Sequence, residues 1–86
     1  MPDVRYWSDE RARKALMDEG RHVFAQVQSE LEGRSGVIAI EPESGAYWIG
    51  ATLGKANDAA YPHAPDRWLY FRRLDDPDAE ILLPSW

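Results

Sequence analysis

The chain contains no cysteine among its 86 residues, which excludes disulfide bonds, cysteine-ligated zinc sites and thiol nucleophiles. It also lacks a long apolar run, because the longest, Val37–Ile40, is far too short to cross a membrane. No signal-peptide pattern opens the sequence, so we expect a cytoplasmic protein without membrane association. Positive charge is scarce as well, since 10 Lys and Arg stand against 15 Asp and Glu, a net charge of −5. This balance disfavours contact with a phosphate backbone, and we expect no nucleic-acid partner.

The length of the chain predicts a single domain that spans residues 1–86, because a second hydrophobic core would need more chain. A chain of this size buries roughly 60–65% of its unfolded surface, so it can fold alone but only marginally. The pattern of elements places the folded core at about residues 8–74 and leaves residues 75–86 as a C-terminal tail.

The first third of the sequence predicts an amphipathic helix. Ser8 can act as the N-cap, and acidic residues follow it in the first turn, where the helix dipole favours negative charge. Apolar residues then recur with helical spacing at Ala12, Leu16, Val23, Phe24, Val27 and Leu31. Gly20 costs about 1 kcal/mol relative to alanine in a helix. The segment is therefore either one helix or two, over residues 8–19 and 21–32.

A β-hairpin is expected after the helix. Residues 37–41 and 46–51 are rich in β-branched and aromatic side chains, and they flank the turn sequence Pro42-Glu43-Ser44-Gly45. A four-residue loop pairs Ile40 with Tyr47, whereas a three-residue loop would shift the register by one position. The first register places Ile38, Ile40, Tyr47 and Ile49 on one face and Val37, Ala39 and Trp48 on the other.

The remaining sequence predicts a short helix and a third strand. Thr52 is a candidate N-cap, and Pro62 ends the helix. Residues 67–74 alternate in the manner of a half-buried strand. We therefore expect an α+β fold, in which an N-terminal amphipathic helix packs on a three-stranded antiparallel sheet of order 2-1-3. The short crossover helix connects the second strand to the third.

Three motifs follow one another between residues 33 and 74. They are the hairpin Gly36-Val-Ile-Ala-Ile-Glu-Pro-Glu-Ser-Gly-Ala-Tyr-Trp-Ile-Gly50, a helix that ends near Tyr61-Pro62, and the aromatic-basic strand Arg67-Trp-Leu-Tyr-Phe-Arg-Arg73. Together they resemble a group of small bacterial α+β domains of unknown function that have a P-E-S/T-G hairpin. The matching residues belong to turns and core, so the resemblance implies a fold and carries no catalytic residue. Such domains are often encoded beside toxin–antitoxin-like or aspartyl-protease-like neighbours, which implies an antitoxin-like role as one alternative.

Few residues offer catalytic or metal-binding chemistry. The two histidines, His22 and His63, lie in the predicted helix and in a proline-flanked loop, and there is no Gly-x-Ser-x-Gly elbow. Asp58, His63 and Asp66 match no established metal-ligand spacing, and the acidic segment of residues 75–80 lacks the calcium-loop pattern. We therefore predict no catalytic residue, no metal site and no cofactor, and we do not expect an enzyme.

The aromatic residues carry the strongest functional signal. Alternation along the strands predicts that Trp48, Trp68 and Tyr70 project from one face of the sheet, with Arg72 beside them. If the helices cover the aliphatic face, this aromatic face is left for a partner, and exposed aromatic patches are typical of protein interfaces. We therefore interpret the chain as a small non-enzymatic protein-interaction module that uses these four residues. Its partner would be a second copy, as a homodimer, or another protein.

Other interpretations stay open at this point. The helices can straddle the sheet, or residues 81–83 of the tail can fold back, and either arrangement would cover the aromatic face. A small ligand-binding domain or enzyme could instead use a pocket near His63 and Asp66. The antitoxin-like protein that the resemblance implies is the third alternative.

Overall fold

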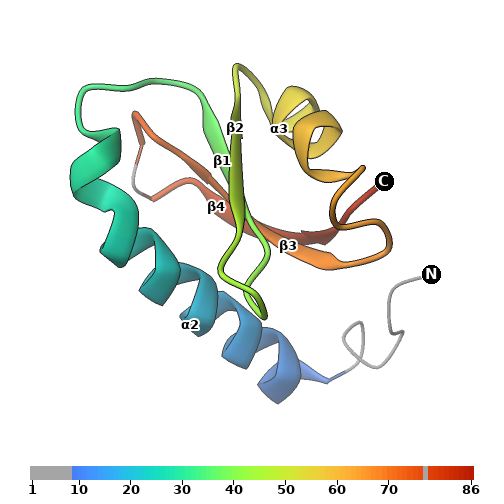
Figure 1. Cartoon of the computed structure of the whole chain (residues 1–86). Helices are drawn as coiled ribbons and strands as arrows, with labels where there is room; N and C mark the ends of the chain where they lie inside the picture. Colours follow the sequence, from blue (N-terminus) through green and yellow to red (C-terminus); the bar gives the residue numbers. More distant parts are fainter. Residues whose placement is uncertain (1–8, 77) are drawn as a thin grey trace.

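The computed structural model describes residues 9–76 and 78–86, which form a four-stranded sheet with one α-helix on each face (Figure 1). The elements in chain order are α2 (Glu10–Val27), the 3₁₀ helix η1 (Gln28–Leu31), β1 (Val37–Ile40), β2 (Tyr47–Gly50), α3 (Leu53–Ala60), β3 (Trp68–Arg73) and β4 (Glu80–Pro84). Every pair of neighbouring strands is antiparallel, and the strand order is β2-β1-β3-β4. The α+β class and the 2-1-3 order of the first three strands are confirmed.

Helix α2 is continuous through Gly20, which decides between the one-helix and two-helix alternatives. Its N-cap is Asp9, whose carboxylate accepts two backbone N–H groups of the first turn. The predicted cap, Ser8, lies outside the described residues. Glycine is required at position 20 because α2 comes very close to β3. A Cβ there would lie 2.6 Å from Cβ and 2.7 Å from Cδ2 of the fully buried Tyr70.

The β1–β2 hairpin has the predicted four-residue loop and register, with Ile40 paired to Tyr47. Gly45 closes the loop at a φ of +79°, a conformation that residues with a side chain rarely adopt. Its N–H donates to the Glu41 carbonyl oxygen at 2.9 Å. The two predicted sets of hairpin side chains therefore lie on opposite faces of the sheet.

The crossover helix α3 begins where the sequence predicts. The hydroxyl of Thr52 accepts the Lys55 N–H at 3.2 Å and so caps the first turn. The third strand, Trp68–Arg73, falls within the predicted residues 67–74. Local capping and alternation thus locate both elements correctly.

A fourth strand is the main departure from the prediction. The sequence was expected to end in a tail over residues 75–86, but Glu80–Pro84 forms β4 and pairs with β3 along its whole length. The three-stranded sheet and the tail are therefore both wrong. Asp76 accepts the backbone N–H groups of Asp78 and Ala79, so the acidic segment reverses the chain instead of ending the sheet. The apolar run that follows can then bury one side against β3.

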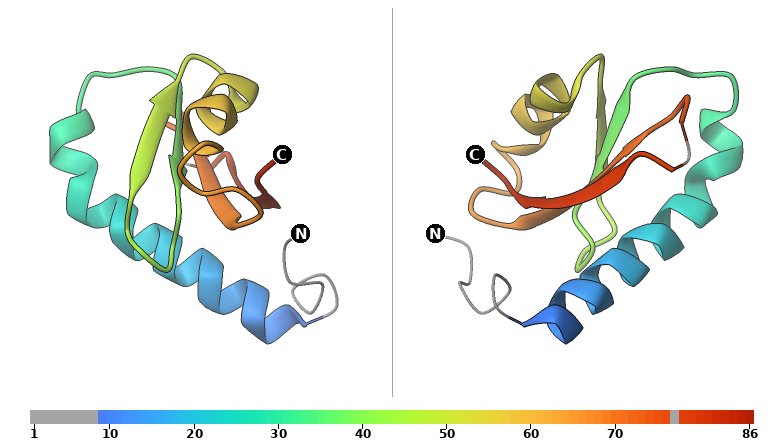
Figure 2. Two further views of the ribbon diagram at one scale, coloured as in Figure 1. Left: turned by 45° about the vertical axis from the view of Figure 1, so that its right-hand side comes forward. Right: turned by 180° about the vertical axis from the view of Figure 1, so that it is seen from behind.

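The sheet separates two apolar clusters, each with its own helix (Figure 2). The cluster on the α3 side consists of Val37, Ala39, Ala56, Ala60, Ala64, Leu69 and Phe71, with Trp48 and Leu83 packed against it. The cluster on the α2 side is built around Val23, Phe24, Leu31, Ile38, Ile40 and Tyr70. Because α3 packs mainly on β1 and β2, the β3–β4 half of its face is left without a helix among the described residues.

Candidate functional site

The predicted aromatic face is not one surface in the structure. β3 pairs with β1 in a register that places Tyr70 on the α2 side of the sheet. Trp68 and Arg72 lie on the same side, because side chains alternate along a strand. Trp48 pairs with Ala39 and lies on the α3 side. The prediction that Trp48, Trp68, Tyr70 and Arg72 share one face is therefore wrong.

The physical reason lies in the connection between β2 and β3. A tight turn fixes the register of a hairpin, but β2 and β3 are joined through α3, and no local turn sets how β3 aligns with β1. Alternation within β3 leaves two phases open, and the packing of the whole domain selects one of them. The structure has the phase of β3 that is opposite to the predicted one.

The residues of β3 that were expected to meet a partner are used inside the chain. Tyr70 is fully buried and Trp68 is only 7% exposed. The guanidinium carbon of Arg72 lies 4.1 Å from the centre of the Phe24 ring, a cation–π contact with α2. The two helices straddle the sheet, which is one of the alternatives that the sequence leaves open. Trp68 and Tyr70 thus lack the exposure on which their predicted interaction role depends, and Arg72 is half-buried against α2.

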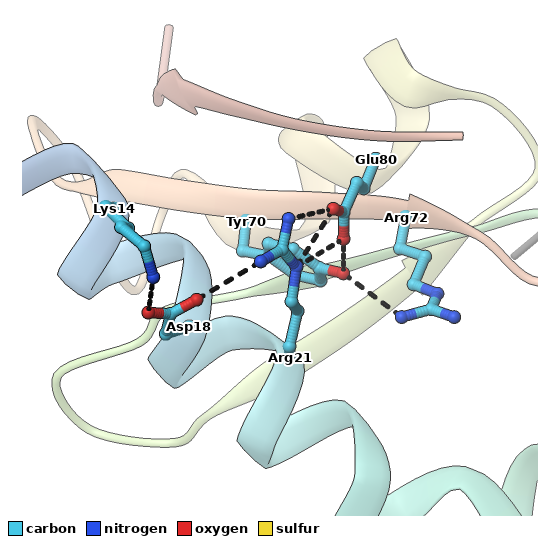
Figure 3. A network of polar contacts seen from close by, with 6 residues as sticks. All are labelled: Lys14, Asp18, Arg21, Tyr70, Arg72 and Glu80. Atoms are coloured by element: carbon cyan, nitrogen blue, oxygen red, sulfur yellow. Dashed lines mark hydrogen bonds and ion pairs between the residues drawn. The ribbon is translucent and has the colours of Figure 1, made fainter. Parts of the chain in front are cut away.

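A charged network fastens α2 to β3 and β4 (Figure 3). Arg21 of α2 forms an ion pair with Glu80 of β4, and its Nε lies 2.9 Å from Oε1 of the carboxylate. The Tyr70 hydroxyl donates to the same carboxylate, and Nη1 of Arg72 donates to the Tyr70 oxygen at 3.3 Å. Asp18 accepts a further bond from Arg21 at 3.1 Å. The network therefore joins α2 to β3 and β4, two strands that lie far from it in sequence.

The contacts of this network shift the pKa values of its members. The hydrogen bond from Arg21 lowers the pKa of Glu80 in spite of the partial burial of that carboxylate. The same bond raises the pKa of Arg21. Burial, together with the hydrogen bond to Glu80, raises the pKa of the Tyr70 hydroxyl. At neutral pH the ion pair is thus charged and the tyrosine protonated, an arrangement that holds helix and sheet together.

An open hollow of about 560 Å³ lies beside His63. Trp48, half-buried, lines it and stacks on the His63 ring, with 5.8 Å between the ring centroids and 14° between the planes. Nη1 of Arg67 pairs with the Glu43 carboxylate at 3.3 Å beside the two rings. Asp66 is not among the lining residues, so the structure brings only half of the predicted His63–Asp66 pair to this hollow. Its exposed charges of opposite sign are paired with each other.

A larger hollow, of about 630 Å³, opens on the α3 side of the sheet. Its lining is mainly apolar and includes Leu53 of α3, Phe71 of β3 and Ile81 of β4. Leu53 is 36% exposed and Ile81 is 47% exposed. Trp86 is 56% exposed and packs against Phe71, with 5.9 Å between the ring centroids. We call the surface that Leu53, Phe71 and Ile81 line the apolar hollow; Trp86 lies next to it, against Phe71, and is not part of its lining.

The position of Trp86 is set by a buried polar contact. Asn57 of α3 is fully buried, and its Nδ2 donates to the Trp86 carbonyl oxygen at 2.6 Å. Its Oδ1 accepts the Trp86 backbone N–H at 3.2 Å. Because one side chain satisfies both backbone groups, the indole is held against Phe71 instead of moving freely with the end of the described chain.

Sequence reasoning missed the residues of the apolar hollow. Helical spacing puts Leu53 on one face of α3 with Ala56 and Ala60, but only the two alanines are buried. Ile81 was assigned to the tail. A signal was available for Ile81, because five residues that include an apolar run directly after a turn are typical of a strand. No local signal shows that Leu53 is exposed, because its exposure depends on where α3 begins relative to the sheet.

Within residues 9–76 and 78–86, no group of three or more His, Asp or Glu side chains is arranged to hold a metal ion. In the same part of the chain, no helix combines the length and the apolar character that crossing a membrane requires.

Comparisons with known proteins place the chain in no family. No family model matches it, and neither the search of curated proteins nor the search of solved structures found a match. The functional argument therefore depends on the geometry of the apolar hollow and of the strands around it.

Proposed function

We propose that the protein is a small non-enzymatic association module that binds another polypeptide through the apolar hollow. The observation that supports this proposal is that two large exposed side chains, Leu53 and Ile81, line one concave and mainly apolar surface, and that the exposed Trp86 packs on Phe71 of the same lining. Isolated exposed apolar residues are normal on any protein, but a contiguous group around a hollow is typical of an interaction site.

The size of the exposed group agrees with this role. Full burial of a large apolar side chain contributes about 1.5–3 kcal/mol. Leu53 and Ile81, the two exposed residues that line the hollow, are about one third and one half exposed, so that covering both would contribute on the order of 2 kcal/mol. That is the scale of an interface hot spot.

The shifted pKa values also favour a binding role over catalysis. The groups concerned are Asp18, Arg21, Tyr70 and Glu80, and their shifts come from contacts within the network that fastens α2 to the sheet and, for Tyr70, mainly from burial. In the hollow beside His63, the exposed charges of Arg67 and Glu43 bind each other. We therefore rank a ligand-binding site at His63 below association through the apolar hollow.

The proposal is tested by retention of proteins from a cell lysate on the immobilised chain. We expect wild type to retain a protein that Leu53→Lys and Ile81→Lys lose at least tenfold. Tyr61→Lys is the matched control, because Tyr61 is 40% exposed at the other end of α3, as its C-cap, and does not line the apolar hollow. If wild type retains nothing beyond the control column and also sediments as a monomer at millimolar concentration, the association role is wrong.

A further inference from the structure

The outer side of β4 is an open sheet edge. β4 has β3 as its neighbour on one side, and in the right-hand view of Figure 2 it runs across the front of the molecule with no described helix or loop before it. The Ser85 N–H donates inward, to the Arg67 carbonyl oxygen at 2.8 Å. Because bonding alternates along an antiparallel pair, the backbone groups of Glu80 and Leu82 point outward. Unpaired donors and acceptors in a row form a template for another strand.

This edge lacks the free charge that commonly protects an exposed strand. Glu80 is the only ionisable residue of β4, and its carboxylate is held on the α2 side by Arg21 and Tyr70. On the other face Ile81 is 47% exposed. The edge therefore combines open backbone groups with an uncovered apolar side chain, directly beside the apolar hollow.

We propose that β4 pairs with β4 of a second copy of this chain, antiparallel, about a two-fold axis at Leu82. This inference rests on the association role proposed above, and it places a second copy at the β4 edge, which shares Ile81 with the apolar hollow but does not include Leu53. In this register the two Leu82 residues exchange N–H···O=C bonds, and each Glu80 N–H meets the Pro84 carbonyl oxygen of the partner subunit. Every outward N–H of the strand is used, and Pro84, which has no N–H, falls at the two ends of the pairing.

The side chains are self-complementary in the same register. On the α3 side, Ile81 meets Leu83 of the partner subunit, so that its exposed surface is covered. On the α2 side, Glu80 meets Pro84 of the partner subunit, so that no like charges face each other across the edge. An isologous contact needs such a surface, because each residue must suit its symmetric counterpart.

The contact is small, and we expect a weak dimer. A pair of five-residue strands buries less than the roughly 1,600 Å² of a standard interface, which indicates a Kd on the order of 100 µM. Each copy carries a net charge of −5, and this repulsion is screened by salt. The dimer should therefore be stronger at high than at low ionic strength.

Amide hydrogen exchange followed by NMR tests the pairing residue by residue. The Leu82 and Glu80 amides should exchange rapidly at about 10 µM and about fivefold more slowly at about 1 mM, where most of the chain would be dimeric. The Ile49 amide, on the outer side of β2 at the opposite edge, is the control and should not change. Protection of Ile49 in place of Leu82 would assign the contact to β2 and overturn the proposal, as would rapid exchange of both at 1 mM.

Three variants separate this inference from the proposed function. Leu82→Pro removes the N–H at the axis without removing a bond to β3, and it should abolish the dimer. Leu82→Pro also changes a residue that packs against the α2-side cluster. Ile81→Lys tests the same pairing without changing that cluster. Leu53→Lys changes the apolar hollow away from β4 and should leave sedimentation unchanged. A monomeric wild type that binds another protein through Leu53 overturns the β4 pairing and keeps the association role.

Discussion

Replacing Gly20 by alanine gives the sharpest test of how α2 packs on the sheet. Helix propensity alone predicts that Gly20→Ala stabilises the protein by about 1 kcal/mol, because glycine is unfavourable inside a helix. The structure predicts the reverse. The added Cβ would come within 2.7 Å of three atoms of Tyr70, about 1 Å inside ordinary van der Waals contact. Tyr70 cannot move aside easily, since it is fully buried and its hydroxyl is bound to Glu80.

The magnitude follows from two opposing contributions. Overpacking a tight core costs about 1–3 kcal/mol, and an overlap with several atoms of a fixed ring belongs at the upper end. The gain in helix propensity offsets about 1 kcal/mol of this cost. We therefore expect Gly20→Ala to lower the free energy of unfolding by about 2 kcal/mol. Urea titration followed by tryptophan fluorescence measures the change as a shift of the midpoint.

Gly54→Ala is the matched control for this experiment. Gly54 also lies in a helix, and a Cβ there meets no atom within 4 Å. Its replacement should raise stability by about 0.4–1 kcal/mol, because alanine restricts the unfolded chain. If Gly20→Ala stabilises the protein as Gly54→Ala does, the close contact between α2 and Tyr70 is refuted. A second check is Tyr70→Leu, which should remove most of the penalty of alanine at position 20 in a double-mutant cycle.

Four further predictions concern the α3 cap, the buried Asn57 and two titratable groups. Thr52→Ala removes the α3 cap and should cost about 1 kcal/mol in urea titration, whereas Thr52→Ser should cost little. Asn57→Ala leaves the backbone of Trp86 without its buried partners and should cost about 1–3 kcal/mol, with a red shift of the indole emission, and unchanged emission would contradict it. The lowered pKa of Glu80 means that its contribution to stability is present above the unfolded pKa of about 4.5 and is lost as the pH falls through the folded value. Glu80→Gln should therefore flatten the fall of Tm below about pH 5, and an equally steep fall would refute the assignment. The raised pKa of Tyr70 works in the opposite direction, so stability should decline above about pH 10 and decline less in Tyr70→Phe.

The parts of the fold that the sequence predicted correctly are those with local causes. Gly45 and the turn before it set the hairpin register, and Thr52 marks the start of α3. The register between β1 and β3 has no such cause, because it depends on which side chains of β3 fit beneath α2. That is why Tyr70 was placed on the wrong face. Sequence alone also could not show that Gly20 is a contact to Tyr70 and not a break in the helix.

The sequence predicted the kind of candidate site, an exposed apolar surface, but not the residues that form it. Exposed apolar side chains on a small acidic domain were expected, but of the residues named Trp68 and Tyr70 are buried, and Trp48 and Arg72 are half-buried. The residues that are exposed, Leu53 and Ile81, owe their exposure to the absence of a helix over the β3–β4 half of the α3 face among the described residues. The lack of a helix there results from the arrangement of whole elements, and no single sequence motif predicts it.

The ion pair between Arg21 and Glu80 joins residues that are 59 positions apart. During synthesis, α2 leaves the ribosome long before β4 has been made. Until Glu80 has been added, Arg21 lacks its carboxylate partner and the Tyr70 hydroxyl lacks its acceptor. Non-local contacts of this kind slow folding, because the intervening chain has to be ordered first. We therefore expect a nascent chain stalled before Glu80 to lack a stably docked helix and to be a substrate for chaperones and proteases.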